Sequence, residues 1–128
     1  MTKQAIHSPD APAAIGPYSQ AIRTGDTLWM SGQIPLDPST MAIVEGGIEA
    51  QAARVLDNMQ AVLKAAGGEL DDIVKLTLLM ADLADFGKVN EIMATYFTAP
   101  YPARATYQVA ALPKAARIEV EGILVLAA

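Results

Sequence analysis

The stretch PARATYQVAALPKAARIEVEGILVL, residues 102–126, decides the plan of the fold because it predicts the last two strands. Extended runs over 105–110 and 117–126 flank a proline-containing turn. Arg104 precedes the first run and Glu119 lies in the second, both among apolar and small residues. Because an unpaired buried charge is very costly, each side chain needs a partner or a polar cavity. A guanidinium suits a carboxylate or a phosphate, so the stretch predicts a pocket for a small anion, with chemistry on water.

The middle of the chain changes period. Apolar residues recur at spacings of three and four across 48–66, which predicts a helix that ends at Gly67-Gly68. Residues 74–80 follow as a strand, and a second helix carries the stripe Phe86, Val89, Ile92 or Met93, and Tyr96. Asp82 and Asp85 precede this helix as candidate caps.

The first third of the chain predicts a proline-rich arm and two strands. The arm holds Pro9, Pro12 and Pro17, and we expect it to be ordered or semi-ordered. Strands are expected over 19–23 and 27–34, with a turn at Gly25-Asp26 between them. The element order is then strands, helix, strand, helix, strands, which predicts an α+β fold.

Two helices can cover only one face of a five- or six-stranded sheet. Leu28, Met30, Leu124 and Leu126 look too apolar for the other face to lie open to water. We therefore expect that face to be buried by association, with a cyclic oligomer as the simplest closed solution. A monomer in light scattering at micromolar concentration would contradict this expectation.

Composition sets further limits. The chain has 128 residues, enough for the single domain that we expect over 1–128, and 52% of them are hydrophobic. A net charge of −5 without a basic run disfavours nucleic-acid binding. There is no cysteine and a single histidine, His7, which leaves out thiol chemistry, histidine triads and multi-histidine metal sites. No apolar run is long enough to span a membrane or resembles a signal peptide, and we expect a cytoplasmic location.

Arg104 has two interpretations. It is either a bidentate clamp on a substrate carboxylate or one half of a structural salt bridge to Glu119 or Glu121. The two glutamates lie two apart, so in a strand they share one face while Ile118 and Val120 share the other. One glutamate could orient or deprotonate water, and the alternative is a solvated strand edge.

Four more residues are candidates for the same pocket. Tyr18 follows Gly16-Pro17 and either closes the pocket or anchors an interface or the core. Ser31 and Gly32 offer a hydroxyl and a backbone N–H beside a missing Cβ, or they form a plain bulge. Asn90 interrupts the stripe of the second helix, and we expect it to brace a loop.

At these residues the chain resembles the RidA/YjgF family of reactive-intermediate deaminases. The resemblance runs nearly end to end, in order and in spacing. The matching segments are Ala13-Ala14-Ile15-Gly16-Pro17-Tyr18, Ser31-Gly32-Gln33-Ile34-Pro35, Leu56-Asp57-Asn58, Asp72-Ile73-Val74-Lys75, Val89-Asn90, Pro102-Ala103-Arg104, Val109-Ala110-Ala111-Leu112-Pro113 and Ile118-Glu119-Val120-Glu121.

The resemblance implies a chorismate-mutase-like α+β fold, in which a homotrimer forms a central β-barrel with pockets between subunits. It also implies an activity of the 2-iminobutanoate/2-iminopropanoate deaminase type, which hydrolyses 2-imino acids to 2-keto acids and ammonia without a metal or an organic cofactor. Arg104 then matches the carboxylate ligand and Glu119 the residue that positions water. Tyr18, Ser31, the Gly32 backbone and Asn90 fall at pocket positions of the family.

The chain also departs from the family pattern. Many members have serine and cysteine after the arginine, where this chain has Ala105 and Thr106. Thr106 still offers a hydroxyl and a backbone N–H to a carboxylate, whereas Tyr107 is bulky for its position. The segment 97–101 is shorter than in many relatives. These differences concern the range of substrates more than the type of reaction.

Three rival functions stay open at this point. The pocket could bind a keto acid or similar carboxylate as a non-catalytic sensor. Some relatives carry a ribonuclease description, which the acidic composition disfavours here. A holdase-type chaperone is a third possibility, and no residue of the sequence points to it.

Overall fold

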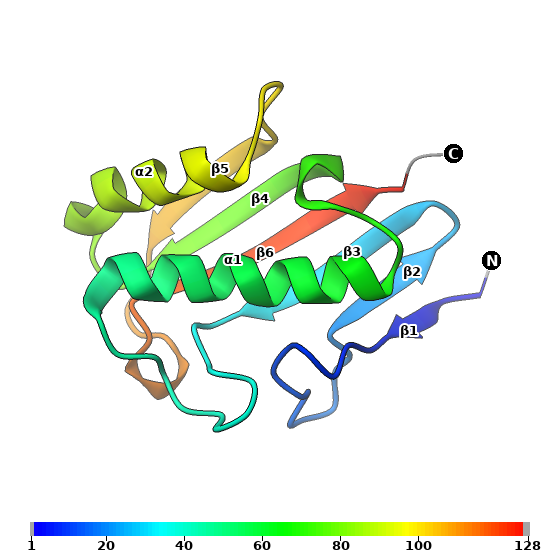
Figure 1. Cartoon of the computed structure of the whole chain (residues 1–128), viewed down its shortest axis with the longest axis horizontal. Helices are drawn as coiled ribbons and strands as arrows, with labels where there is room; N and C mark the ends of the chain where they lie inside the picture. Colours follow the sequence, from blue (N-terminus) through cyan, green and yellow to red (C-terminus); the bar gives the residue numbers. More distant parts are fainter. Residues whose placement is uncertain (1, 127–128) are drawn as a thin grey trace.

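Two helices lie against one face of a six-stranded sheet in the computed structural model, which describes residues 2–126 (Figure 1). The strands are β1 (Gln4–Ile6), β2 (Ala21–Thr24), β3 (Thr27–Gln33), β4 (Ile73–Met80), β5 (Ala103–Gln108) and β6 (Ile118–Val125), and the helices are α1 (Gly47–Ala65) and α2 (Phe86–Tyr96). The strand order is β1-β2-β3-β6-β4-β5. Within the described residues only β4 and β5 pair in parallel, and α2 supplies the crossover between them. The predicted mixed α+β fold is confirmed.

Helix α1 matches its prediction to within a residue because its apolar period is regular. Its inward stripe includes Val55, Met59 and Val62, which are fully buried. The helix ends as expected for a glycine stop: Gly67 adopts a φ of 82°, and the Gly68 N–H donates to the Leu63 carbonyl at 2.9 Å.

The start of α2 corrects part of the prediction. Asp82 does cap, but it accepts from the Ala84 N–H in the short 3₁₀ turn before the helix. Asp85 occupies the N-cap position without capping, and its carboxylate binds the Arg117 guanidinium at 2.7 Å instead. The apolar stripe of the helix is confirmed by the burial of Val89 and Met93.

The expected strands are present with shifted ends. Strand β2 begins two residues later than predicted, and β5 spans 103–108 instead of 105–110. Strand β1 precedes the arm and was not predicted, because three residues are too few to show alternation. It pairs with β2 at the edge of the sheet.

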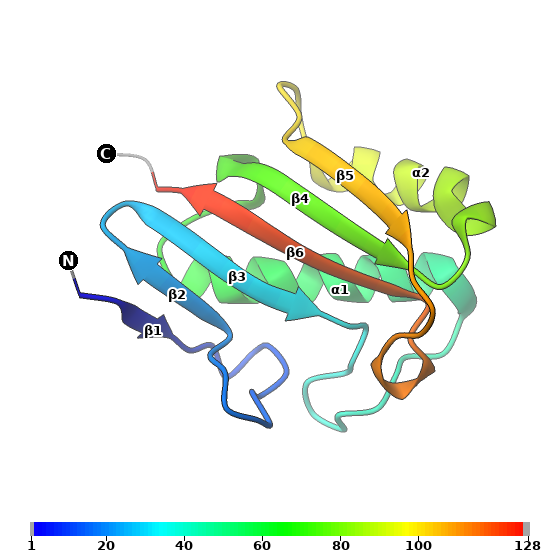
Figure 2. The ribbon, with the colours of Figure 1, turned by 180° about the vertical axis from the view of Figure 1, so that it is seen from behind.

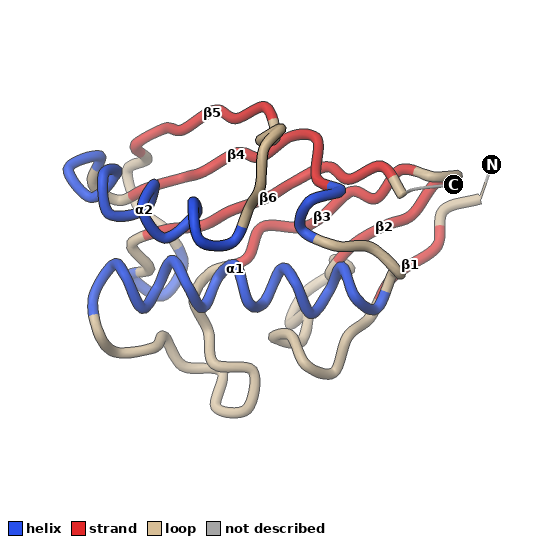
Figure 3. The backbone as a smooth tube through the Cα atoms, turned by 45° about the horizontal axis from the view of Figure 1, so that its top comes forward, coloured by secondary structure: helices blue, strands red, loops and turns tan. Residues whose placement is uncertain are grey.

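The two faces of the sheet differ from the expectation in one respect. Leu28, Met30, Leu124 and Leu126 are buried on the helix side, so the prediction that they face away from the helices is wrong. Figure 2 shows the opposite face of the sheet without helix cover, and Figure 3 shows both helices on one side of the strands. Trp29, Tyr107 and Val125 are the large apolar side chains that the open face exposes, at 50%, 58% and 46%. The open face thus does expose large apolar side chains, but through the other residue of each alternating pair.

Among residues 2–126, no helix combines the length and the apolar character that a membrane crossing requires.

Candidate functional site

Arg104 and Glu119 lie on opposite faces of the sheet. In the parallel pair, Arg104 is in register with Leu76, which is fully buried beneath the helices. Glu119 is in register with Leu79, and neighbours in a strand alternate between faces, so Leu79 and Glu119 belong to the open face. Strand β6 is an inner strand. A small ligand therefore cannot touch both side chains of one chain.

The first hollow lies beside Arg104, at the edge strand β5. It has a volume of about 480 Å³ and a mostly apolar lining, whose polar side chains are one amide, one phenol and one guanidinium. Its lining residues are Asn90, Met93, Ala94, Phe97, Tyr101, Pro102 and Arg104. All of them come from one continuous stretch of chain that runs from α2 into β5.

Arg104 is held by only one edge of its guanidinium. Its Nη1 donates to Asn90 Oδ1 at 2.7 Å and contacts Met93 Sδ at 3.7 Å. Its Cζ lies 4.9 Å from the centroid of the Phe86 ring, a cation–π contact. Among residues 2–126, no hydrogen-bond acceptor engages Nε or Nη2, and Arg104 forms no ion pair. The free Nε–Nη2 edge is the geometry that binds a carboxylate in bidentate fashion.

These contacts settle two sequence interpretations. The structural salt bridge from Arg104 to Glu119 or Glu121 is excluded within the chain, because the glutamates are on the other face. Asn90 does not brace a loop as expected, since its side-chain oxygen accepts from Arg104.

The second hollow lies beside Glu119 and has a volume of about 310 Å³. Three loops from distant parts of the sequence meet there: the arm before β2, the turn after β3 and the turn before β6. Its lining residues are Pro12, Ala13, Ile15, Tyr18, Gln20, Gly32, Gln33, Ile34, Leu36, Met41, Pro113, Lys114 and Glu119. Tyr18, Gly32 and Glu119 are thus brought together as a group.

Glu119 sits in a half-buried position that changes its acidity. Burial raises the pKa of its carboxyl above the usual value, and the negative charge of Glu121 raises the pKa further. A Cβ on residue 32 would overlap the Glu119 carboxylate, so Gly32 leaves the space that this side chain occupies. A carboxylate of raised pKa beside a hollow is suited to accept a proton from water near neutral pH.

Ser31 and Thr106 line neither hollow. The Ser31 hydroxyl donates to the Ser19 carbonyl at 2.5 Å, and the Ser31 N–H donates to the Gln20 carbonyl at 3.0 Å. Thr106 follows Arg104 by two residues on the same face of β5, and its buried hydroxyl has no hydrogen-bond partner within residues 2–126. A substrate contact for these two residues stays a prediction.

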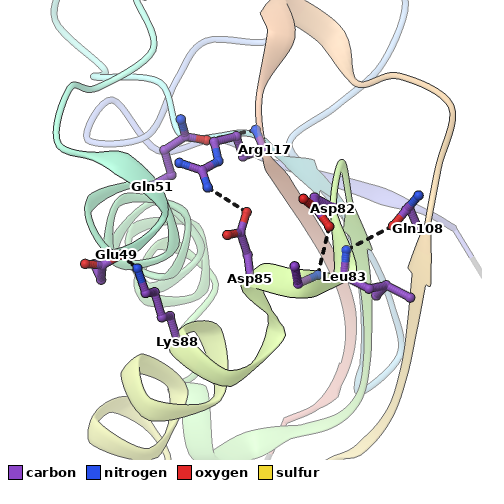
Figure 4. A network of polar contacts seen from close by, with 9 residues as sticks. Glu49, Gln51, Asp82, Leu83, Asp85, Lys88, Gln108 and Arg117 are labelled. Carbon is purple, nitrogen blue, oxygen red and sulfur yellow. Dashed lines mark hydrogen bonds and ion pairs between the residues drawn. The ribbon is translucent and has the colours of Figure 1, made fainter.

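The strand that carries Glu119 is anchored at its start by Arg117 (Figure 4). The Arg117 N–H donates to Gln51 Oε1 at 2.8 Å, and its carbonyl accepts from the Ala81 N–H at 3.1 Å. Its guanidinium pairs with Asp85 at the start of α2. The backbone and the side chain of Arg117 together hold the start of β6 against α1 and α2.

Lys114 and Met41 belong to the second hollow and were missed in the sequence. Lys114 Nζ donates to the Met41 carbonyl at 3.0 Å, which ties the turn before β6 to the loop after β3. Both residues have positive φ values, 56° and 59°, which side-chain-bearing residues adopt rarely. Lysine and methionine are not residue types that favour positive φ, so this contact could not be predicted from the sequence.

A metal ion has no evident place in either hollow. Residues 2–126 contain no cluster of three or more histidine, cysteine, aspartate or glutamate side chains arranged to hold one.

Comparison with known proteins identifies the class to which this sheet and its hollows belong. The solved structure of RidA from the Antarctic bacterium Psychrobacter sp. has a TM-score of 0.93 and 48% identity, with 96% of this chain and 99% of that one covered. The structure of Escherichia coli TdcF with bound serine has a TM-score of 0.92 and 39% identity, with coverages of 97% and 99%.

The sequence comparisons agree with the structural ones. The mouse 2-iminobutanoate/2-iminopropanoate deaminase is 51% identical over 123 residues, which are 96% of this chain and 91% of that protein. A family model described as Endoribonuclease L-PSP matches residues 8–126. The chain belongs to this family, which is the RidA/YjgF family of the predicted resemblance.

Proposed function

We propose that this protein hydrolyses reactive 2-imino acids to 2-keto acids and ammonia. The observation that carries the proposal is the free Nε–Nη2 edge of Arg104, a residue that lines a mostly apolar hollow and has no acidic partner within residues 2–126. The mouse relative, at 51% identity, is named for the deamination of two such acids. The serine bound to Escherichia coli TdcF is an amino acid with a carboxylate, which also supports an anion clamp.

The role of Arg104 in the proposal is to fix the substrate. Its free edge donates two charge-assisted hydrogen bonds to the carboxylate, while Asn90 keeps the guanidinium oriented from the opposite side. The carbon next to the carboxylate belongs to the C=N bond, so the clamp also fixes the position of the reacting atom.

Glu119 acts on the water molecule. The imine reacts in its protonated form. As the water oxygen bonds to the imine carbon, one water proton passes to the Glu119 carboxylate and the C=N electron pair moves to the nitrogen, which gives a neutral carbinolamine. Glu119 then returns its proton to the nitrogen, the C–N bond breaks, and ammonia leaves. The carbonyl of the keto acid forms as the hydroxyl releases its proton, which ammonia takes up as ammonium. The raised pKa of Glu119 makes it the stronger base for the first step. These steps require neither a metal nor an organic cofactor.

A complete site in this proposal needs two chains. Arg104 and Glu119 lie on opposite faces, so we infer that Arg104 of one protomer meets Tyr18, Gly32 and Glu119 of the next in a closed homotrimer. The exposed Trp29, Tyr107 and Val125 on the open face support such an assembly. We also propose that Ser31 and Thr106 belong to this pocket. The proposed location of the protein is cytoplasmic.

The direct test couples an amino-acid oxidase or a serine/threonine dehydratase to the purified protein and follows imine decay. Semicarbazide traps the surviving imine, so an active deaminase lowers the semicarbazone yield. We expect the protein to shorten the imine lifetime, and we expect Arg104→Ala and Glu119→Gln to lose this effect. An imine lifetime that the wild-type protein leaves unchanged would refute the proposed reaction.

Subunit complementation tests the shared site. We expect Arg104→Ala and Glu119→Gln to be inactive alone, and their co-expressed mixture to regain about a quarter of wild-type activity. Each site of a random mixed trimer has a one-half chance that its arginine is intact and an independent one-half chance that its glutamate is intact. One quarter of the sites are therefore complete. Mixed oligomers without any recovered activity would show that both residues act within one chain.

The same variants separate the rival functions. A sensor would bind a keto acid in calorimetry without changing the imine lifetime. The family description names an endoribonuclease, and RNA cleavage by highly purified protein that disappears in Arg104→Ala would favour that activity.

A further inference from the structure

The arm that carries Tyr18 has few hydrogen bonds of its own. It runs from residue 8 to residue 20 between β1 and β2, as the blue loop of Figure 1. Its three prolines have no N–H to donate. The backbone bonds inside the arm are a short turn from the Tyr18 N–H to the Gly16 carbonyl at 2.8 Å and a long contact from the Ala11 N–H to the Ser8 carbonyl at 3.4 Å. Such an arm needs support from a side chain.

Gln20 supplies this support from a fully buried position. Its Oε1 accepts from the Ser8 N–H at 2.6 Å, and its Nε2 donates to the carbonyls of Ser8 at 3.1 Å and Pro12 at 2.9 Å. Gln20 and Ser8 are each only 3% exposed. The side-chain amide thus pairs with the backbone N–H and carbonyl of Ser8, as a residue of a neighbouring strand would. Its second N–H binds the Pro12 carbonyl on the other side of the arm.

The position of Gln20 connects this support to the second hollow. Gln20 itself lines the hollow, and Tyr18 lies two residues before it. The Gln20 carbonyl also accepts from the Ser31 N–H, which ties the base of the arm to β3 beside Gly32. Tyr18 is 52% exposed, so few packing contacts hold its ring in place.

We propose that Gln20 is a positioning residue for Tyr18: its amide holds the arm closed so that the tyrosine stays at the mouth of the Glu119 hollow. The inference rests on the proposed function, in which Tyr18 meets the substrate. Without the three hydrogen bonds of Gln20, the arm opens and each binding event must order it again.

Gln20→Glu is the sharpest variant because it keeps the size of the side chain and changes one group. A carboxylate can still accept from the Ser8 N–H, but its second oxygen faces two carbonyl oxygens and has no proton to donate. The protonated form restores one donor. Burial and the two carbonyls raise the pKa of the new carboxyl in the folded protein. The arm is therefore closed at low pH and opens as the pH rises through that raised pKa.

The first measurement compares kcat and KM of Gln20→Glu and wild type across pH, at a low temperature where both stay folded. We expect KM at pH about 8 to rise by roughly tenfold relative to wild type, and the ratio to return toward one at about pH 5. Gln51→Glu is the matched control: Gln51 is also buried but uses only its side-chain oxygen, as an acceptor from Arg117. We expect this control to stay within about twofold of wild type at both pH values.

The second measurement combines Gln20→Glu with Tyr18→Ala. If Gln20 acts through Tyr18, the double variant loses no more activity than Tyr18→Ala alone. Additive losses, or a KM of Gln20→Glu equal to wild type at pH about 8, would overturn the inference. A Tyr18→Ala variant of full activity would instead refute the part of the proposed function that places Tyr18 at the substrate.

Gln20→Met serves where the glutamate variant does not fold. It removes all three hydrogen bonds without adding a charge, so the KM should rise at every pH, with the same loss of effect in the Tyr18→Ala background. In that case, a Gln20→Met protein with wild-type KM would overturn the inference.

Discussion

The two hollows of this protein are built in opposite ways. The Arg104 hollow comes from one continuous stretch, from Asn90 on α2 to Arg104 on β5. The Glu119 hollow collects residues from Pro12 to Glu119, through three loops that meet only in the folded chain. Arg104 is exposed and has free donors, whereas Glu119 is half-buried and its acidity is set by its surroundings. The Arg104 hollow thus offers free cationic donors, whereas the Glu119 hollow depends on the rest of the fold.

Removal of the clamp should have the largest effect. Arg104→Ala deletes two charge-assisted hydrogen bonds to the substrate, each worth about 1.5–3 kcal/mol, so kcat/KM should fall by at least about 100-fold. The imine-decay assay measures the loss, and light scattering should show an unchanged oligomer. Arg23→Ala is the control, since the hydrogen bond of the Arg23 side chain within residues 2–126 is the one to the nearby Gly25 carbonyl. Full activity of Arg104→Ala would reject the clamp.

Loss of the base should act on a different constant. Glu119→Gln keeps the shape of the side chain but cannot accept the proton of water, so we expect kcat to fall by at least about 100-fold. KM should change little, because the carboxylate of the substrate is held by the other half. A variant that raises KM and spares kcat would assign Glu119 to binding instead. The contrast with Arg104→Ala tests whether Arg104 binds the substrate while Glu119 acts on the water.

Asn90→Ala should weaken the first hollow in part. The variant removes the 2.7 Å hydrogen bond to Arg104 Nη1, so the guanidinium loses orientation while it keeps its charge. At about 1 kcal/mol for such a bond, KM should rise roughly fivefold with kcat nearly unchanged. Steady-state kinetics with the oxidase-coupled assay measure the change. An unchanged KM would mean that Arg104 needs no support from α2.

The smallest expected effect is a shift in pH dependence. The pKa of Glu119 is raised from 4.5, first by burial and then by Glu121, so the active carboxylate is lost as the pH falls through the raised value. Glu121→Gln removes the second cause, and the acid limb of kcat should therefore move to lower pH. The same raised pKa makes ionisation of Glu119 unfavourable for folding as the pH rises through it. An acid limb that stays in place would assign it to another group.

Regular periodicity explains how much of the fold could be predicted from the sequence. Helix α1 repeats its apolar stripe over five turns, and its prediction is correct to within a residue. The predicted face of Leu28 and Met30 is wrong because Trp29 interrupts the polar set that Thr27 and Ser31 form on the other face of β3. An alternation of apolar and polar residues is what tells the two faces apart, and Trp29 breaks it in the middle of the strand.

The candidate site shows the same limit. Arg104 and Glu119 stand out in the sequence through their charge in apolar surroundings and through the family resemblance. Their separation onto opposite faces was not predicted, because it depends on the register between β4, β5 and β6. Gln20 has no local signature either, since its three partners lie 8 and 12 residues away along the chain.

In the proposed trimer, the opposite placement of Arg104 and Glu119 makes protein concentration a control on catalysis. A separated chain would then carry two incomplete pockets, each of which lacks the residues of a neighbour. Specific activity should therefore collapse on dilution below the dissociation constant of the subunits and return on reconcentration, without any change in the fold of the chain.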